Sequence, residues 1–257
     1  MLELTYKFGR GNWRNIKEGN EREWLIGNGI GGYASHTIIG GGFTCYHSYL
    51  VAAMNPPVER YTVFTRTQEQ VIVDGREYDL TSQQYVNYAK NGQEYLQRFI
   101  FNSVPQYIYQ VEDINIKKTI AMEYGHNTVV VCYEVTNGSR PAKLNIVPLF
   151  NFRPAGATTE RNELKFTREL RGNVLKLIPE AKRDITISFF TSEGVYKDRA
   201  LRPTSMATPN YLIEENHYYE FDNRNGALSL DNHFTPYDIE LDLAPRERKL
   251  FYIKCTR

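Results

Sequence analysis

The residues of this sequence that are best placed to bind something gather in one glycine-rich segment. Seven of the eighteen glycines fall between Gly27 and Gly42, and no other window concentrates glycine in this way. Trp24 precedes the segment, Tyr33 lies within it and Tyr46 follows it. Because glycine has no side chain, such a cluster indicates tight turns or a close approach of the backbone to another group. The segment is therefore either a set of structural turns or an aromatic-bordered loop that lines a ligand site.

The order of these glycines does not match a nucleotide site. The run Gly27-Asn28-Gly29-Ile30-Gly31-Gly32 comes near to the dinucleotide fingerprint, but it lacks the required spacing and a βαβ setting. A phosphate-binding P-loop is also missing, because no Gly-Lys-Ser or Gly-Lys-Thr occurs in the chain. We therefore expect no cofactor.

The histidines and cysteines lack the spacing of a metal or nucleophile site. Cys45 and His47 supply at most two metal ligands, and the other histidines are scattered. There is no Gly-x-Ser-x-Gly elbow and no recognised catalytic cysteine signature. His47 could donate to a ligand hydroxyl, or it could be an ordinary histidine packed beside a sheet. We expect no metal site and no nucleophilic catalysis.

Paired carboxylates are a further possibility, because the two acids of a glycosidase converge in space from distant sequence positions. The available glutamates are Glu134, Glu160, Glu163, Glu169, Glu214 and Glu215. The sequence does not pair them, and most acidic residues here have basic neighbours, which is typical of a solvated surface. We assign no catalytic residue.

The composition argues against nucleic acid and membrane partners. Lys and Arg number 31 against 30 Asp and Glu, so no overall field attracts polyanions or acidic membranes. No apolar stretch is long enough to span a bilayer, and the amino terminus lacks the features of a secretory signal. The three cysteines are widely separated, which fits free thiols. We expect a cytoplasmic protein.

Apolar residues recur mainly with period two, which predicts β-strands. Asp74-Gly75 separates Val71–Val73 from Arg76–Leu80 and readily supplies the positive φ angles of a two-residue hairpin turn. Tyr61–Thr67 would be the strand before it. Nineteen tyrosines and thirteen phenylalanines suit pleated sheets and equally suit sugar stacking.

The downstream sequence adds many short strands. Ile114–Ile120 alternates cleanly, Thr128–Thr136 is a β-branched run that ends at Asn137-Gly138, and Lys143–Phe152 should return as its partner. Further strands are expected at Gln106–Val111, Asn173–Leu177, Ile185–Thr191, Tyr218–Phe221, Tyr237–Leu243 and Lys249–Lys254. Two prolines make Asp198–Asn216 the expected irregular segment. We predict an all-β fold: one large antiparallel β-sandwich, or supersandwich, over residues 1–257 with few or no helices.

Several motifs occur in the order and spacing of a known family. Around the glycines they are Glu23–Leu25, Asn28–Tyr33, Thr37–Gly40, Tyr46-His47, Leu50–Ala53 and Pro56-Pro57. Later motifs are Gly125–Val131, Tyr133–Gly138, Pro148–Arg153, Asp231, Phe234, Pro236 and Leu243–Pro245. In these features the chain resembles, over essentially its whole length, the amino-terminal domain of glycogen debranching enzymes of the bacterial and archaeal amylo-α-1,6-glucosidase type.

The resemblance implies the amino-terminal domain of a larger glycosidase. In that family a helical α/α barrel follows the sandwich and carries the catalytic carboxylates, and no such barrel is present in these residues. The chain is then a non-catalytic domain, inactive alone, that supports the barrel of the same parent chain and helps to line a cleft for glycogen or another branched α-glucan. By this analogy the cleft-facing or barrel-interface residues are Trp24, Asn28, Gly31, Gly32, Tyr33, Tyr46, His47 and Arg153.

Two segments depart from the family pattern. The family usually has arginines before the Tyr-His pair and a glycine after it, whereas this chain has Thr44-Cys45 and Ser48. After Asn-Phe-Arg the family usually has an acidic residue and a histidine, whereas Pro154-Ala155-Gly156 stands here.

Two other functions stay open at this point. The chain could be a stand-alone glucan-binding module that uses Trp24 and Tyr33 as stacking platforms. It could also be a scaffold whose exposed apolar patch serves protein association only.

Overall fold

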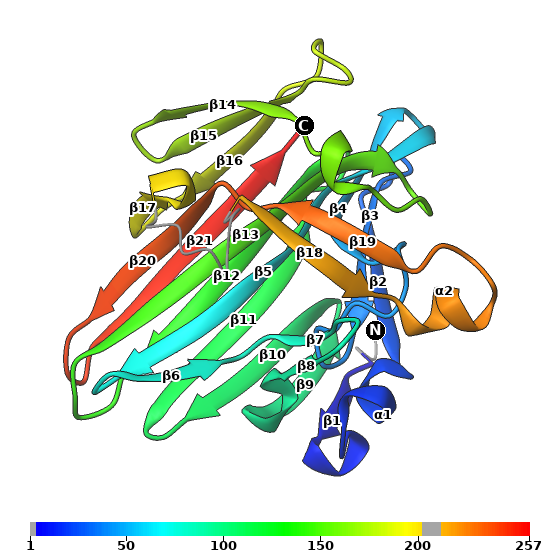
Figure 1. The fold of residues 1–257 in the computed structure, drawn as a ribbon. Coiled ribbons are helices and arrows are strands. Elements are labelled where there is room, and N and C mark those ends of the chain that lie inside the picture. Colours follow the sequence, from blue (N-terminus) through cyan, green and yellow to red (C-terminus); the bar gives the residue numbers. More distant parts are fainter. Residues whose placement is uncertain (1–3, 202–211) are drawn as a thin grey trace.

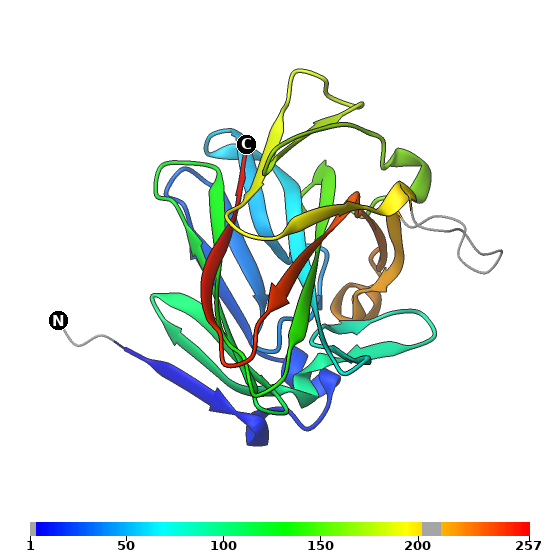
Figure 2. The same cartoon turned by 90° about the vertical axis from the view of Figure 1, so that its left-hand side faces the viewer.

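The computed structural model describes residues 4–201 and 212–257. In these residues the chain forms two large antiparallel sheets, one short two-stranded sheet and two short α-helices (Figure 1). The view turned by 90° shows the large sheets curving around a common interior (Figure 2). The predicted all-β antiparallel sandwich is confirmed. No helix within the described ranges is long and apolar enough to cross a membrane.

The first large sheet has nine strands within the described residues, and we call it the nine-stranded sheet. In spatial order it contains β1 (Tyr6–Gly9), β9 (Leu96–Asn102), β10 (Val104–Val111), β11 (Ile114–Met122), β12 (Thr128–Thr136), β21 (Arg248–Thr256), β16 (Ile187–Thr191), β15 (Val174–Pro179) and β14 (Phe166–Arg171).

The second, which we call the ten-stranded sheet after its strands in the same described residues, lies opposite. Its main order is β17 (Val195–Asp198), β20 (Tyr237–Leu243), β13 (Ala142–Pro154), β5 (Val58–Val73), β4 (Ser48–Asn55), β3 (Tyr33–Thr37) and β2 (Glu23–Gly27). Three further strands branch from this order: β6 (Arg76–Asp79) pairs with β5, β19 (Leu230–Phe234) pairs with β13, and β18 (Ile213–Tyr218) pairs with β19. The smaller elements are β7 (Ser82–Gln84), β8 (Ala89–Asn91), α1 (Ile16–Asn20), α2 (Glu220–Arg224), and the 3-10 turns η1 (Arg10–Asn12), η2 (Gly92–Glu94), η3 (Arg161–Glu163) and η4 (Arg199–Leu201).

The Asp74-Gly75 hairpin is confirmed. Val73 at the end of β5 pairs with Arg76 at the start of β6. Asp74 and Gly75 have φ angles of 49° and 75°, as a two-residue turn of this kind requires. The strands expected at Gln106–Val111, Asn173–Leu177, Ile185–Thr191, Tyr237–Leu243 and Lys249–Lys254 are present as β10, β15, β16, β20 and β21.

The expected pairing of Thr128–Thr136 with Lys143–Phe152 is wrong. β12 pairs with β11 and β21, whereas β13 pairs with β5 and β20 in the opposite sheet. After Asn137 the chain crosses between the sheets. The Asn137 side-chain amide donates to the carbonyl oxygens of Leu243 and Ala244, at 3.2 and 2.7 Å. These bonds hold the chain in the crossover and replace the tight turn that Asn-Gly would otherwise favour.

Two other boundaries differ from expectation. The strand expected at Tyr218–Phe221 ends at Tyr218, and α2 begins at Glu220. The Phe221 N–H donates to the Phe43 carbonyl oxygen (3.1 Å), so this turn is set by a contact far away in sequence. The irregular segment expected at Asp198–Asn216 includes the first four of the six residues of β18, and its residues 202–211 lie outside the described part of the chain.

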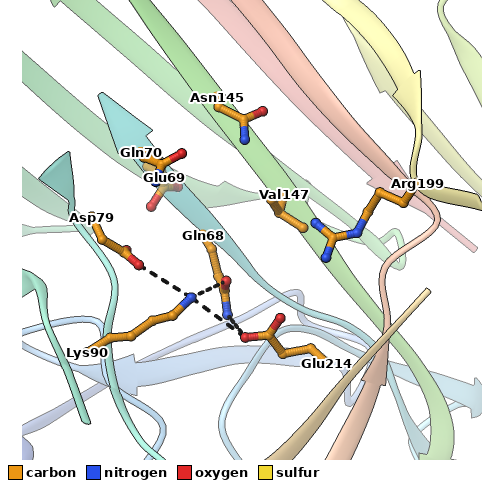
Figure 3. Close-up of a pocket in the computed structure, with 9 residues that line it drawn as sticks. All are labelled: Gln68, Glu69, Gln70, Asp79, Lys90, Asn145, Val147, Arg199 and Glu214. Carbon is orange, nitrogen blue, oxygen red and sulfur yellow. Dashed lines mark hydrogen bonds and ion pairs between the residues drawn. The ribbon is translucent and has the colours of Figure 1, made fainter. Parts of the chain in front are cut away.

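The two faces of the ten-stranded sheet differ in polarity. Val71 and Val73 of β5 belong to the apolar core between the sheets. Gln68 of β5 projects from the opposite face, together with Asn145 and Val147 of β13 (Figure 3). We call this second side the outer face.

A second layer covers much of the outer face. Figure 1 shows β18 crossing in front of β13 and β5. The β7–β8 hairpin meets β18 through a bridge between Tyr85 and His217, and the Arg66 guanidinium on the outer face donates to Gln83 of that hairpin (2.6 Å). All four of these side chains are buried. The ten-stranded sheet is therefore covered on both faces, with an apolar inner side and a polar outer one.

An ion pair crosses the interior between the sheets. Lys118 Nζ of β11 lies 2.6 Å from Glu69 Oε1 of β5, and both side chains are 4% exposed. The Tyr133 hydroxyl donates to the same carboxylate oxygen (2.7 Å). A buried pair is costly to break from one side, because the remaining charge then has no counter-ion.

We predict that Lys118→Met lowers the free energy of unfolding by roughly 3–5 kcal/mol. The double variant Glu69→Gln with Lys118→Met should recover much of this loss, because it removes both charges and keeps an acceptor for Tyr133. Lys117→Met is the control, since Lys117 forms an exposed pair with Glu134 and should cost less than about 1 kcal/mol. Urea unfolding measures all three. Equal losses for the Lys117 and Lys118 variants would contradict the assignment.

Candidate functional site

The glycine-rich segment lies at one border of the ten-stranded sheet. Gly27 ends β2, Tyr33 begins β3, and the residues between them form the hairpin turn. Gly40–Gly42 belong to the loop that joins β3 to β4. Because β2 is the last strand on this side of the sheet, the turn lies at its margin.

Asn28 organises this hairpin turn. Its side chain is fully buried, and its Oδ1 accepts the backbone N–H of Ile30 (3.1 Å). Its amide nitrogen donates to the His126 carbonyl oxygen (2.9 Å) and to Asn127 Oδ1 (3.1 Å). Both partners follow β11 on the nine-stranded sheet, so Asn28 fastens the turn to the opposite sheet.

Two of the glycines are required by close packing. Gly31 has a φ angle of 98°, and a Cβ there would overlap the backbone of Pro57. A Cβ on Gly32 would lie 2.5 Å from Asn28 Nδ2 and 2.9 Å from the Val51 carbonyl oxygen. At these positions the glycines serve the turn itself, which supports the structural reading of the segment there.

Trp24 of β2 is held in the interior. Its side chain is 5% exposed, and its indole N–H donates to the Tyr107 hydroxyl (2.5 Å), which itself donates to the Thr37 carbonyl oxygen (2.8 Å). The ring also borders a cavity of about 490 Å³ between β1 and β2, with Phe8 and Phe99 among its other walls. Trp24 thus joins the margins of both sheets.

His47 closes the loop before β4. The ring is 2% exposed, and its Nδ1 accepts the backbone N–H of Phe43 (3.1 Å). Nε2 therefore carries the proton, and it lies 3.4 Å from the Glu23 carboxylate. The interaction with His47 is the main cause that holds the pKa of Glu23 below its ordinary value. His47 thus bonds to its own loop through Nδ1, while Nε2 lies within ion-pair distance of β2 and has no hydrogen-bond partner among the described residues.

The two tyrosines of the predicted site lie nearer the surface. Tyr46 is 52% exposed, while Tyr33 is partly buried and donates from its hydroxyl to the Tyr46 carbonyl oxygen (3.2 Å). Burial raises the pKa of Tyr33 to about 12, so its hydroxyl keeps the proton that it donates. Tyr33 supports the backbone from which the Tyr46 ring projects.

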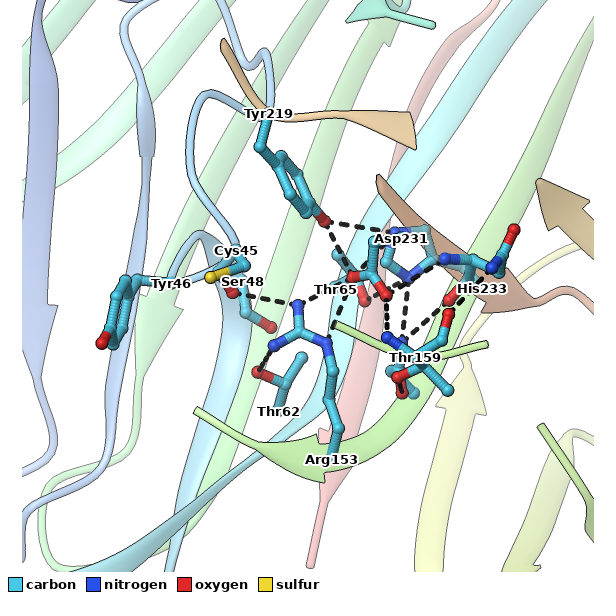
Figure 4. Close-up of polar contacts among 12 residues, drawn as sticks. Cys45, Tyr46, Ser48, Thr62, Thr65, Arg153, Thr159, Tyr219, Asp231 and His233 are labelled. Carbon is cyan, nitrogen blue, oxygen red and sulfur yellow. Dashed lines mark hydrogen bonds and ion pairs between the residues drawn. The ribbon is translucent and has the colours of Figure 1, made fainter. Parts of the chain in front are cut away.

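Arg153 is the centre of a buried polar cluster behind Tyr46 (Figure 4). Its side chain is 3% exposed and lies 2.9 Å from the fully buried Asp231 carboxylate of β19. It also donates to Thr62 Oγ1 (3.2 Å) and to the Cys45 carbonyl oxygen (2.9 Å). Arg153 therefore acts on the site through the backbone beside Tyr46.

Asp231 and His233 connect this cluster to the outer layer. The Tyr219 hydroxyl, just before α2, donates to Asp231 Oδ2 (3.0 Å), and Asp231 Oδ1 accepts the Thr159 N–H (2.8 Å). The His233 ring lies between Tyr219 and Thr65 at 3.4 and 3.2 Å. Burial lowers the pKa of His233 to about 4, although the Asp231 carboxylate opposes the shift. The ring is neutral at pH 7.

The two segments that depart from the family pattern meet in space. A side chain on Gly156 would overlap the Tyr46 ring. On the other side of the loop, Thr44 Oγ1 and the Cys45 N–H both donate to the buried Asp222 carboxylate of α2, at 2.8 and 2.6 Å. The substituted residues thus form one continuous support around Tyr46.

The structure brings together some of the eight predicted residues and separates others. Tyr33, Tyr46 and Arg153 meet at the Cys45–Tyr46 backbone, and Gly31 and Gly32 lie with Asn28 in the turn. Trp24 and His47 support β2 and the next loop. Sequence reasoning missed Asp222, Tyr219 and His233, since nothing in their spacing links them to the glycines. Asp231 was identified only as part of a motif of the family that the chain resembles.

The remaining candidates for chemistry are the metal-ligating and acidic side chains. Within residues 4–201 and 212–257 no group of three or more His, Cys, Asp or Glu side chains could hold a metal ion. Among the glutamates considered as acids, Glu134, Glu169 and Glu215 form partly exposed ion pairs with basic side chains. Glu214 lies on the outer face with its side chain 17% exposed.

A sequence profile of the family described as glycogen debranching enzyme N terminal matches residues 22–250, which include the whole glycine-rich segment and the Arg153 cluster. The chain belongs to this family. The resemblance expected from the motifs is confirmed. No curated protein matches the sequence.

Several solved structures are similar to this debranching-enzyme N-terminal domain. A protein named as a kojibiose phosphorylase, from the human microbiome, has 12% identity and a TM-score of 0.38, over 92% of this chain and 26% of the other. A bacterial glucoamylase in complex with acarbose has 12% identity and a TM-score of 0.39, over 91% and 30%. A polysaccharide lyase has 10% identity and a TM-score of 0.35, over 77% and 25%. The chain spans only a quarter to a third of these proteins.

We predict that Gly31→Ala destabilises this N-terminal domain more than Gly75→Ala. Both glycines have positive φ angles, but a Cβ on Gly75 meets open space. The Gly75 variant should lose about 1–2 kcal/mol from backbone strain, and the Gly31 variant about 1–3 kcal/mol more because of overlap with Pro57. Urea unfolding gives both values. Equal losses would show that the turn can relax away from Pro57.

We also predict a loss of stability in acid. Burial lowers the pKa values of His36, His217 and His233 in the native state. In the unfolded chain these histidines bind protons near pH 6.5, whereas in the native chain they stay neutral to lower pH. Their contribution to stability is therefore fully present above pH 6.5 and falls as the pH drops towards 4. His233 alone accounts for roughly 3 kcal/mol over this interval.

The pH dependence of urea unfolding between pH 7.5 and 4.5 tests this assignment. His233→Gln should flatten the dependence, and His126→Gln, which changes an exposed ring, should leave it unaltered. The same slope in wild type and His233→Gln would be the contrary result.

Proposed function

We propose that this chain is the non-catalytic N-terminal domain of a glycogen debranching enzyme of the amylo-α-1,6-glucosidase type. In this proposal it supports a catalytic α/α barrel of the same parent protein, with the Tyr46 side of the glycine-rich segment turned towards the barrel and its glucan cleft. Family membership supports the class of parent enzyme. The geometry around Tyr46 supports the choice of face.

The carrying observation is a set of exposed apolar side chains on a rigid base. Tyr46 is 52% exposed and Phe221 of α2 is 49% exposed; we call these two residues the docking patch. The loop and α2 are joined because the Asp222 carboxylate accepts bonds from Thr44 and Cys45. Ordered apolar side chains that stay exposed mark a contact surface more often than scattered ones do.

The remaining predicted site residues have a positioning role in this proposal. Trp24 is too deeply buried to offer a ring face to a sugar, and its bond to Tyr107 holds β2 in place. Asn28 and Arg153 fix the turn and the Tyr46 backbone. Among the side chains of these predicted residues, Tyr46 and, in part, Tyr33 have surface to offer a barrel or a glucan.

A non-catalytic role fits the state of the acidic groups near the patch. Asp231 is paired with Arg153, and Asp222 accepts two bonds from the neighbouring loop. The Glu23 carboxylate lies 3.4 Å from His47 Nε2. A general acid or base needs an exchangeable proton within reach of substrate, and these carboxylates are committed to holding the loops. The proposal therefore places bond cleavage in the barrel.

The purified chain is expected to release no glucose from branched dextrin. Mixed with a separately produced catalytic barrel of the same parent type, it should form a complex on size-exclusion chromatography. Tyr46→Ala with Phe221→Ala should weaken that complex about tenfold or more, as for central apolar anchors. Tyr252→Ala, which removes an exposed tyrosine of the nine-stranded sheet, is the matched control. Glucose release by the chain alone, or docking indifferent to the Tyr46 and Phe221 changes, would refute the proposal.

A further inference from the structure

A second surface feature lies on the outer face of the ten-stranded sheet, apart from the docking patch. It is a pocket of about 160 Å³ between β5, β13, the β7–β8 hairpin and β18 (Figure 3). Its walls are almost entirely polar, and they are Gln68, Glu69, Gln70, Asp79, Lys90, Asn145, Val147, Arg199 and Glu214. Drug-sized sites occupy roughly 300–1,000 Å³, so this pocket suits one small ring or the end of a chain.

The polar groups of the pocket are pre-ordered. Gln68 is 6% exposed; its amide nitrogen donates to Glu214 (3.0 Å), and its oxygen accepts from Lys90 Nζ (3.0 Å). Lys90 Nζ also lies 3.3 Å from Asp79 and 3.7 Å from Glu214. Burial alone would raise the pKa of Glu214, but Lys90 and the bonds from Tyr85 and Gln68 outweigh it and lower that pKa. Glu214 is therefore a fixed carboxylate acceptor.

The charges of the pocket largely cancel, which decides what kind of ligand fits. Lys90 stands between Glu214 and Asp79, and Arg199 is paired with Asp238 (2.8 Å). The Glu69 carboxylate is directed to the interior between the sheets, where it is paired with Lys118. An anion would meet carboxylates, and a metal ion would meet the ammonium and guanidinium groups. A neutral ligand with many hydroxyls can instead donate to carboxylate and amide oxygens and accept from the amide nitrogens and cations.

One acceptor in the pocket still lacks a donor. Asn145 Oδ1 is buried and accepts no hydrogen bond from the described residues, although Asn145 lines the cavity. A buried polar atom without a partner is costly, and a ligand hydroxyl would satisfy it.

An exposed aromatic ring lies near the pocket, outside the nine residues that line it. Tyr88 is 56% exposed, and its ring lies parallel to that of buried Tyr85, with centroids 4.4 Å apart. The Tyr85 hydroxyl donates to Glu214 (2.6 Å), and the charges of Glu214 and Asp79 both act on Tyr88. The Tyr88 ring is thus held beside the polar walls with one face open, and such a face can cover the apolar side of a sugar ring.

We propose that this pocket is a binding site for a terminal glucosyl unit of an α-glucan, with Tyr88 stacking on the ring and Asn145, Gln68 and Glu214 bonding its hydroxyls. The choice of glucose among neutral sugars rests on the proposed function, whereas the pocket and its preference for a neutral polyol do not. The site would hold glucan on the N-terminal domain independently of a barrel. It is a binding site without catalysis.

The test is isothermal calorimetry of the whole chain with maltose, maltotriose and isomaltose, and with lactose as the galactoside comparison. Tyr88→Ala should weaken glucoside binding about tenfold. Asn145→Leu should weaken it as well without loss of thermal stability, because the Oδ1 atom has no donor to lose among the described residues. Tyr252→Ala is the control and should bind as wild type does.

The outcomes separate this inference from the proposed function. Absence of glucoside binding, binding unaffected by Tyr88→Ala and Asn145→Leu, or a preference for lactose would overturn the glucosyl site. None of these results changes the barrel-docking experiment, which depends on Tyr46 and Phe221. Failure of docking with intact, Tyr88-dependent glucoside binding would instead refute the support role and leave the pocket standing.

Discussion

The structure depends on the burial of a polar sheet face. The inner side of the ten-stranded sheet packs against the other sheet through apolar residues, but its outer side carries Arg66, Gln68 and Arg153 beneath a second layer. Buried polar groups need hydrogen-bond partners. Gln83, Glu214 and Asp231 supply them from the β7–β8 hairpin, β18 and β19. The second layer is thus held by directional bonds more than by apolar contact.

This arrangement explains why the two exposed tyrosines discussed above are ordered. Tyr46 follows a backbone carbonyl that Arg153 holds, and Tyr88 stacks on a ring whose hydroxyl bonds to Glu214. In each case an exposed ring is held in position by a network of buried hydrogen bonds. Because the bonds fix position before any partner arrives, little ordering cost remains to be met on binding. The two exposed rings are thus ordered because hydrogen bonds in the buried polar layer fix the segments that carry them.

The sequence predicts the sandwich well and the buried polar layer poorly. Period-two patterns and Asp74-Gly75 identify strands and a hairpin because they depend on neighbouring residues alone. Asn137-Gly138 looks like a similar turn, yet bonds to distant Leu243 and Ala244 make it a crossover. Gln68 and Arg66 resemble solvent-facing residues of a half-exposed strand. Their burial depends on β18 and the β7–β8 hairpin, whose position the local pattern does not encode.

The candidate site shows the same limit, because local sequence patterns do not encode contacts with distant elements. The glycine cluster and the family motifs predict a site at the turn, but Gly31 and Gly32 are needed there by packing against Pro57 and Asn28. The near balance of 31 basic and 30 acidic residues is repeated in the buried ion pairs Lys118–Glu69, Arg153–Asp231 and Arg199–Asp238, each of which joins opposite charges. Such a surface has no strong field with which to steer a charged polymer. It can recognise through apolar rings and fixed hydrogen-bond groups, which are the means that suit an uncharged glucan and the face of a neighbouring domain.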